Sequence, residues 1–145
     1  MKKTFPASQL IINEDGSVFH LHIRPEHLAD KVILVGDQGR VNMVASFFDE
    51  GSIECDIQSR EFHTITGKYH GKRISCISTG IGTDNCDIVL NELDALANID
   101  FVTRTEKDHC KYHDDDVAYR LVDRQSEMSS VNECECSYHR YAGKV

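Results

Sequence analysis

Apolar residues are distributed unevenly along this chain, and their distribution limits which part of it can fold. Leu, Ile, Val and Phe occupy 32 positions in residues 1–105, but only 5 of the 40 positions in residues 106–145. A segment with less than roughly 20% of these residues buries too little apolar surface to fold by itself. We therefore expect one folded domain in residues 1–105, followed by a divergent, disordered tail in residues 106–145.

The charge and the hydropathy pattern argue against several classes of protein. The net charge is -8, and the chain has no Lys/Arg run long enough for the basic surface that nucleic-acid binding requires. It also has no apolar run near the roughly 18 residues that cross a bilayer. Pro6, Ser8 and Gln9 interrupt the first apolar stretch, which is unlike a secretory signal. We expect a cytoplasmic protein that binds neither nucleic acid nor membranes.

The first half of the domain contains one strand, turn and helix unit. The alternating segment Val18–Ile23 predicts a strand that ends before Pro25. Residues 32–35 are continuously apolar, which is typical of a strand buried on both faces of a parallel or mixed sheet. After the glycine turn of residues 36–40, the apolar spacing predicts a helix over residues 41–48.

A second unit follows it. Residues 53–57, 61–67 and 73–78 predict three more strands, and Gly71 suits a tight antiparallel hairpin between the last two. The glycines of residues 80–82 then end the strand. An apolar stripe predicts a helix that runs to Asn98 and is capped by Thr83 or Asp84. Residues 101–103 predict the start of another strand. The pattern as a whole indicates a layered α/β fold.

The turn Gly36–Arg40 combines free backbone N–H groups at a helix start with a guanidinium group, which suits an anion such as phosphate. Many α/β proteins make the same turn without any ligand, so the spacing alone leaves both readings open. The loop Gly80–Gly82 lacks the third glycine of a dinucleotide motif, where Asn85 stands, and no Walker lysine follows. We therefore expect no NAD or ATP cofactor.

The histidines and cysteines give weaker signals. His20, His63 and His70 lie in predicted strands or turns, where a half-exposed structural histidine is the default. Cys55 and Cys76, like Cys86, fall in apolar patterns typical of small buried residues. The tail has further metal-binding residue types, but its Cys-x-Cys spacing is not that of common zinc modules, so we expect no metal site. Those tail residues are His109, Cys110, His113, Asp114, Asp115, Asp116, Cys134, Cys136 and His139.

Four motifs in order resemble the nucleoside phosphorylase family, and in particular its uridine phosphorylase branch. The resemblance runs from about Ser17 to about Thr105. Its motifs are Val18–Leu21, Gly36–Arg40 against the family's Gly-Asp-Pro-x-Arg, Arg60–Phe62, and Ser78–Gly82 followed by the helix with Asn91–Leu93.

The resemblance implies a layered αβα fold with a mixed sheet. It also implies a pentosyltransferase of nucleoside catabolism and pyrimidine salvage, which cleaves a pyrimidine nucleoside with inorganic phosphate into ribose 1-phosphate and free base. Phosphate is then a co-substrate, and no further cofactor is expected. By position, Gly36 and Arg40 would hold phosphate, Arg60 would reach the phosphate of a neighbouring subunit's site, and His20 would touch the ribose there. A dimer-based homo-oligomer is therefore expected.

The chain also departs from that family. Gln38 stands where the family has proline, and no counterpart of the family's Arg-Ile-Gly-Thr-like segment or of its base-binding and ribose-binding residues follows Thr105. The resemblance thus covers less than half of a normal member and implies a truncated form that is weakly active or inactive, with no catalytic residue assigned. The alternative is a non-catalytic module that binds phosphate or joins an oligomer.

Overall fold

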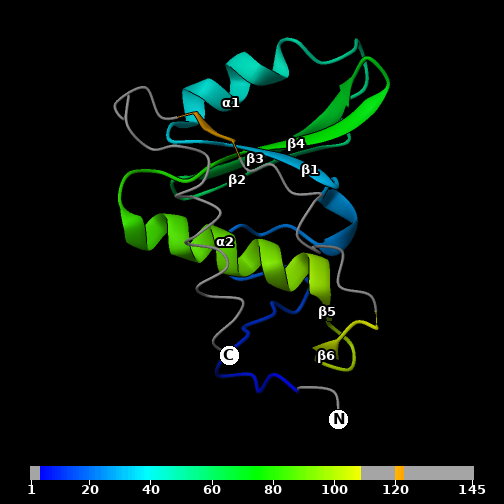
Figure 1. Ribbon diagram of the computed structural model, residues 1–145, viewed down its shortest axis with the longest axis vertical. Coiled ribbons are helices and arrows are strands. Elements are labelled where there is room, and N and C mark those ends of the chain that lie inside the picture. The colour runs from blue at the N-terminus through cyan, green and yellow to red at the C-terminus, as the bar shows by residue number, and fades with distance from the viewer. Residues whose placement is uncertain (1–3, 109–119, 123–145) are drawn as a thin grey trace.

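The computed structural model describes residues 4–108 and 120–122. The sheet lies between helix α1 on one face and helix α2 on the other, so the predicted layered αβα arrangement with a mixed sheet is confirmed (Figure 1). In chain order the elements are the 3-10 helix η1 (Pro25–His27), β1 (Lys31–Val35), α1 (Gln38–Ala45), β2 (Cys55–Ser59), β3 (Phe62–Tyr69), β4 (Lys72–Ser78), α2 (Thr83–Asn98), β5 (Ile99–Asp100), β6 (Thr105–Glu106) and β7 (Arg120–Val122).

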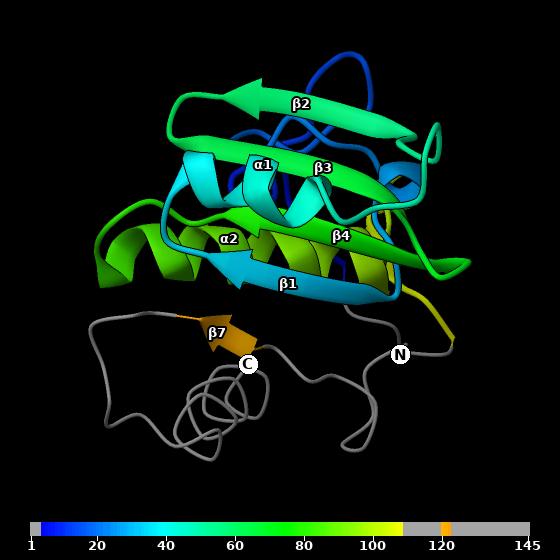
Figure 2. The ribbon, with the colours of Figure 1, turned by 90° about the horizontal axis from the view of Figure 1, so that it is seen from above.

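The main sheet has the strand order β2-β3-β4-β1-β7, which can be followed across Figure 2. Strand β1 runs parallel to both of its neighbours, β4 and β7. Strand β3 runs antiparallel to β2 and β4. The carboxyl ends of β1 and β4 and the start of β3 therefore lie at one edge of the sheet, which we call the carboxyl edge.

Residues 32–35 of strand β1 are all apolar because the sheet is covered on both faces. Val32 and Leu34 belong to the core on the α2 side, together with Phe62 and Leu93. Val35 belongs to a second core beneath α1, which also contains Cys76. A strand that packs on two layers cannot alternate apolar and polar residues, which explains the continuous apolar run.

The predicted hairpin between β3 and β4 is confirmed. Tyr69 pairs with Lys72, which leaves a two-residue turn of His70 and Gly71, with φ angles of 48° and 74°. Positive φ at both turn positions gives a turn whose twist matches that of the flanking strands. The Asp49 carboxylate accepts hydrogen bonds from the N–H groups of His70 at 3.0 Å and Gly71 at 2.9 Å, so a distant segment also holds this turn.

Helix α2 has the predicted extent, but its predicted capping is wrong. The N-cap is Gly82, with φ 110° and no side-chain capping bond, rather than Thr83 or Asp84. Only glycine adopts this backbone conformation without strain, so the turn geometry decided where the helix starts. Helix α1 lies three residues earlier than predicted, since it begins at Gln38 and ends at Ala45, although Phe48 still packs against the same core.

The strand predicted at Val18–Ile23 is wrong. The segment is a closed loop in which the Val18 N–H donates to the Ile23 carbonyl at 3.0 Å and the His22 N–H donates to the Val18 carbonyl at 3.2 Å. Val18, Leu21 and Ile23 are all buried, so the burial does not follow a period of two. The N–H groups of Val18 and His22 donate within the loop, and those of His20 and Leu21 donate to a side chain of α2, so these four donors do not pair with a neighbouring strand.

The strand predicted at residues 101–103 is also wrong. These residues lie in the turn between β5 and β6, where the Asp100 carboxylate accepts hydrogen bonds from the N–H groups of Val102 and Thr103. The sheet instead gains β7, a segment of the predicted tail, beside β1. The other tail residues, 109–119 and 123–145, lie outside the described residues, so the disorder expected of them and the exclusion of a metal site there remain predictions.

Candidate functional site

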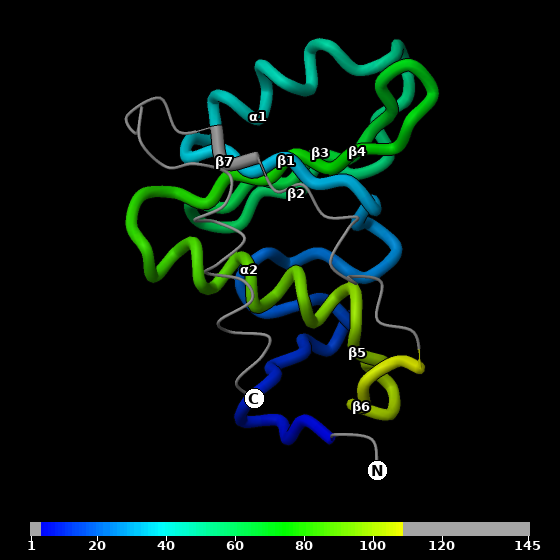
Figure 3. The backbone as a smooth tube through the Cα atoms, viewed as in Figure 1, coloured from blue at the N-terminus to red at the C-terminus, as the bar shows by residue number. Residues whose placement is uncertain are grey.

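Two glycine turns lie side by side at the carboxyl edge. The Thr79 N–H donates to the Val35 carbonyl at 2.8 Å, which keeps the carboxyl ends of β4 and β1 paired side by side. Gly36 follows β1, and a Cβ added to it would lie 4.0 Å from the carbonyl oxygen of Gly80, which follows β4. Figure 3 shows that both chain segments leave the sheet at the same end on their way to α1 and α2. The starts of two helices therefore converge on this edge.

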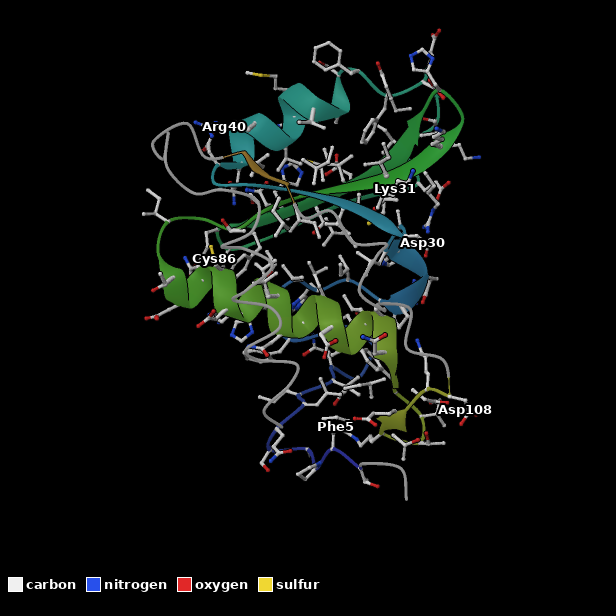
Figure 4. All side chains as sticks on the ribbon, viewed as in Figure 1. Phe5, Asp30, Lys31, Arg40, Cys86 and Asp108 are labelled. Atoms are coloured by element: carbon white, nitrogen blue, oxygen red, sulfur yellow. The ribbon has the colours of Figure 1, made fainter. Side chains whose placement is uncertain are left out.

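The start of α1 offers backbone donors. Its N-cap, Asp37, has extended backbone and makes no side-chain capping bond. The Arg40 N–H donates to the Asp37 carbonyl at 3.1 Å, while the earlier N–H groups of a first helical turn have no partners within the helix. Figure 4 shows Arg40 at the beginning of α1. Donors, the positive end of the helix dipole and a guanidinium group thus lie within one turn.

Arg60 lies at the same edge, on the turn between β2 and β3. Its φ angle is 55°, an uncommon value for a residue with a side chain. The Gln38 side chain donates from Nε2 to the Arg60 carbonyl at 2.7 Å and accepts from Gln58 Nε2 at 2.8 Å. Two glutamines therefore fasten the Arg60 turn to the first residue of α1.

Ser78 secures the start of β3 from the other side. Its hydroxyl donates to the Glu61 carbonyl at 2.9 Å and accepts from the His63 N–H at 2.7 Å. Ser78 is fully buried, so both hydrogen bonds are protected from water. The Arg60 turn is thus held by side chains on both sides.

His20 lies on the α2 side of the sheet. Its ring packs edge-on against the ring of Phe62, the first residue of β3, with centroids 6.3 Å apart. Its Nδ1 atom lies 2.7 Å from Glu92 Oε1 on α2. Because Phe62 begins β3 at the carboxyl edge, His20 also lies near this edge. All four residues assigned from the sequence, Gly36, Arg40, Arg60 and His20, therefore come from segments that reach it. His20 lies on the α2 face of the sheet, and Arg40 lies on the opposite face.

Sequence reasoning missed the residues that hold this arrangement together, chiefly Glu92, Gln38 and Ser78. Glu92 had a detectable signal, since it lies beside the apolar stripe of α2, between the buried Val89 and Leu93. A carboxylate at the border of a buried face needs hydrogen-bond partners. The sequence does not reveal which partners those are.

Two of the described cysteines are buried thiols with raised pKa values. Burial raises the pKa of the Cys76 thiol to about 12, and burial also raises the pKa of Cys55. Both cysteines are buried as predicted, whereas Cys86, in the first turn of α2, is only half-buried.

Within residues 4–108 and 120–122, no three His, Cys, Asp or Glu side chains are grouped as metal ligands would be. In the same residues, no helix is long and apolar enough to span a bilayer.

A small hollow lies away from this edge. It is formed where the segment before β1 meets the C-terminal end of α2, and Lys107 closes it by donating from Nζ to the carbonyls of Leu96 and Ala97. The residues that line it are Pro25, Leu28, Ala29, Asp30, Leu96, Ala97 and Lys107. Since the amino end of β1 is opposite the carboxyl edge, this hollow is separate from the candidate site.

Comparison with known proteins identifies the family. Residues 30–105 match the model of the phosphorylase superfamily. The chain belongs to the phosphorylase superfamily. The resemblance to nucleoside phosphorylases and the fold expected from it are thereby confirmed.

Individual relatives agree with this assignment to the phosphorylase superfamily. A uridine phosphorylase of Thermococcus kodakarensis is 36% identical over 102 residues, which are 70% of this chain and 36% of the relative. A DeoD-type purine nucleoside phosphorylase of Bacillus velezensis is 35% identical over 74 residues, 51% of this chain and 32% of the relative. The crystal structure of a Trypanosoma brucei nucleoside phosphorylase, whose description states that it shows uridine phosphorylase activity, has a TM-score of 0.66 at 42% identity, over 68% of this chain and 30% of that one.

The chain spans about a third of the length of these relatives. Sequences described as uridine and as purine nucleoside phosphorylases match it at similar identity. Both kinds of relative therefore support the same superfamily.

Proposed function

We propose that this chain is a nucleoside phosphorylase-like protein of the uridine phosphorylase type, with inorganic phosphate bound at the carboxyl edge of its sheet. In the reaction, a phosphate oxygen forms a bond to the anomeric carbon of a pyrimidine nucleoside while the bond from that carbon to the base breaks. The products are ribose 1-phosphate and the free base. The convergence of the Gly36 turn, the start of α1 and the Arg60 turn at one edge is the observation that supports this proposal.

The chemistry explains why these groups suit the reaction. As the base departs, the sugar becomes oxocarbenium-like, so phosphate must be held close beneath the anomeric carbon in the correct orientation. Arg40 and the first turn of α1 supply the positive charge and the donors for this on one subunit. We propose that Arg60 completes the phosphate site of a neighbouring subunit and that His20 contacts the ribose there, within a dimer-based homo-oligomer.

By itself, this 145-residue polypeptide is proposed to be weakly active or inactive. The resemblance implies that the residues that would bind the base and most of the ribose lie beyond the matched part of the relatives. Losing even one preorganised donor from such a site costs about 2.7–4 kcal/mol, or about 100- to 1,000-fold in rate. Phosphorolysis of uridine, followed as release of uracil, tests this: turnover at the rate of an ordinary family member would contradict the proposed inactivity.

We also propose that the unrelated segment begins after Thr105. The family match ends at that residue, which supports this boundary. A frameshift or recombination would produce such a junction. Resequencing the gene across the junction and translating all three frames tests the idea, because an Arg-Ile-Gly-Thr-like continuation in another frame is then expected.

Phosphate binding is tested separately by calorimetry with inorganic phosphate. Arg40→Gln is expected to weaken binding about 10- to 100-fold, because a hydrogen bond to a charged group contributes about 1.5–3 kcal/mol. Arg24→Gln is the matched control, since Arg24 is an arginine near the opposite end of the sheet that pairs with Glu26 at 2.9 Å. Equal loss in both variants, or no binding by the wild type, would contradict the assignment of the site.

The alternative function is a non-catalytic module that binds phosphate or joins an oligomer of a full-length relative. The observation in its favour is that the proposed phosphate turn is fully formed in a chain that spans only about a third of its relatives. Co-purification with a full-length relative, together with phosphate binding and no turnover, would distinguish this module from an enzyme.

A further inference from the structure

The carboxylate of Glu92 holds the His20 loop by three hydrogen bonds. Its Oε1 atom accepts from the His20 N–H at 2.8 Å and lies 2.7 Å from His20 Nδ1. Its Oε2 atom accepts from the Leu21 N–H at 2.8 Å. The Glu92 side chain is only 12% exposed, so these bonds lie largely out of water, where charge-assisted hydrogen bonds are strong.

This geometry determines where the His20 imidazole carries its proton. An ionised carboxylate has acceptors only, and each Glu92 oxygen already accepts a backbone N–H. A nitrogen that lies 2.7 Å from such an oxygen must therefore be a donor, which places the proton on Nδ1. In the neutral ring Nε2 is then an acceptor, and no described residue donates to it.

The surroundings keep the ring in this orientation. The His20 ring meets the Phe19 ring edge-on at a centroid distance of 4.9 Å and the Phe62 ring at 6.3 Å. The neighbouring Leu21 is buried in the core on the α2 side. The loop is therefore anchored by its backbone, its apolar residue and its imidazole, while 29% of the His20 side chain remains exposed.

We propose that Glu92 is a positioning residue that fixes His20 as the Nδ1-protonated tautomer, so that Nε2 is presented as a hydrogen-bond acceptor to a hydroxyl group of the nucleoside sugar. The sugar contact rests on the proposed function, whereas the tautomer and its dependence on Glu92 rest on the geometry alone. A sugar hydroxyl is a suitable partner because it can donate to Nε2, which a phosphate oxygen without a proton cannot do.

The chain contains a matched control for this pair. His63 also bonds a carboxylate, but through the other ring nitrogen: Nε2 lies 2.8 Å from Asp56 Oδ1. This carboxylate is 59% exposed and lies on strand β2. Asp56→Asn therefore disturbs a histidine and carboxylate pair in the same molecule without touching the His20 loop.

The test is a histidine nitrogen NMR spectrum of the full chain, labelled with ¹⁵N and recorded at about pH 8, where an ordinary imidazole is neutral. The shifts of the two ring nitrogens report the tautomer directly. The wild type is expected to show His20 with a protonated Nδ1 and an unprotonated Nε2. Glu92→Gln replaces one acceptor oxygen by an amide NH2 donor, so the two His20 shifts are expected to move toward a common average. Asp56→Asn is expected to alter His63 and leave His20 unchanged.

A wild-type His20 protonated on Nε2, or a tautomer unchanged in Glu92→Gln, would overturn the assignment. The wild-type spectrum decides the first point even if the variant does not fold.

Titration with uridine and phosphate then separates the two proposals. An Nε2 signal that moves in the wild type supports the sugar contact. A protonated Nδ1 with an Nε2 signal that does not respond would contradict the proposed sugar contact of His20 while supporting the role of Glu92 in fixing the tautomer.

Discussion

The Thr79 N–H donates a 2.8 Å hydrogen bond to the Val35 carbonyl, to which the Thr79 hydroxyl also donates at 3.4 Å, and these bonds join the two turns of the candidate site. The backbone bond extends the parallel pairing of β1 and β4 one residue beyond Ser78, the last paired residue of β4. The next residues are Gly36 and Gly80, so their backbones remain close as the chain turns toward the two helices. The starts of α1 and α2 are thereby placed relative to each other by the sheet and not by direct contact of the helices.

Gly80→Ala is expected to destabilise the protein, whereas Gly36→Ala is not. Gly80 has φ 71°, and an added Cβ would lie 3.0 Å from Asn85 Nδ2 and 3.1 Å from Glu61 Cγ. The backbone conformation alone costs about 1–2 kcal/mol for alanine. At Gly36 the nearest atom would be at 4.0 Å, an ordinary contact. Urea unfolding measures both free energies, and equal values for the two variants would contradict the expectation.

Gln38 should tolerate proline better than alanine. Gln38→Ala removes two hydrogen bonds, one to the Arg60 carbonyl and one from Gln58. Each loss is expected to lower the free energy of unfolding by about 0.5–1.5 kcal/mol. Gln38→Pro removes the same bonds, but proline suits the first position of a helix and reduces the entropy of the unfolded chain, which contributes about 0.4–1 kcal/mol. The urea midpoints should therefore fall in the order wild type, proline variant, alanine variant. A proline variant less stable than the alanine variant would show that the turn cannot accept it.

Asp49 should make the β3–β4 hairpin sensitive to acid. Hydrogen bonds from the Gly71 and His70 N–H groups lower the pKa of Asp49 from its ordinary value of 3.8. The stabilisation is therefore present above the pKa of the unfolded chain and is lost as the pH falls through the lower pKa of the folded state. Asp49→Asn should be less stable than the wild type near neutral pH, and this difference should shrink in acid.

Urea unfolding over a series of pH values measures the effect of Asp49. Glu50→Gln is the control, since it removes a negative charge from the adjacent exposed residue. If the difference between wild type and Asp49→Asn is the same at every pH, then the hairpin does not depend on the charge of Asp49.

Cys76 should resist alkylation until the chain unfolds. It is fully buried, and burial raises the pKa of its thiol to about 12. The alkylating reagent therefore cannot reach the sulfur atom in the folded protein. Little thiolate is present at pH 8 either, because a thiol of pKa 12 is ionised about 1,000-fold less than one of pKa 9. Cys86 is half-buried and should react in the native protein. Iodoacetamide treatment with and without urea, followed by peptide mass mapping, measures both; rapid labelling of Cys76 without urea would contradict the packing of this core.

Patterns that depend on near neighbours were sufficient to predict much of the fold. The apolar run of β1 reflects burial on both faces of the sheet, whereas the hairpin at His70 and Gly71 and the stripe of α2 each reflect contacts with one adjacent strand or layer. The positions of Gly36 and Arg40 at a helix start follow from the same local pattern. The motifs in order were also enough to recognise the superfamily, because motif order and separation do not require coordinates.

The tertiary structure alone decided how distant segments meet. Val18–Ile23 alternates like a strand, yet it closes into a loop because Glu92, 72 residues after His20, accepts its backbone donors. The link between Gln38 and the Arg60 carbonyl likewise depends on the strand order that brings the β2–β3 turn beside α1. A side-chain hydrogen bond between remote residues leaves no period in the sequence. The sequence by itself therefore determined the elements and the family, and the packing of those elements determined the partners of each polar group.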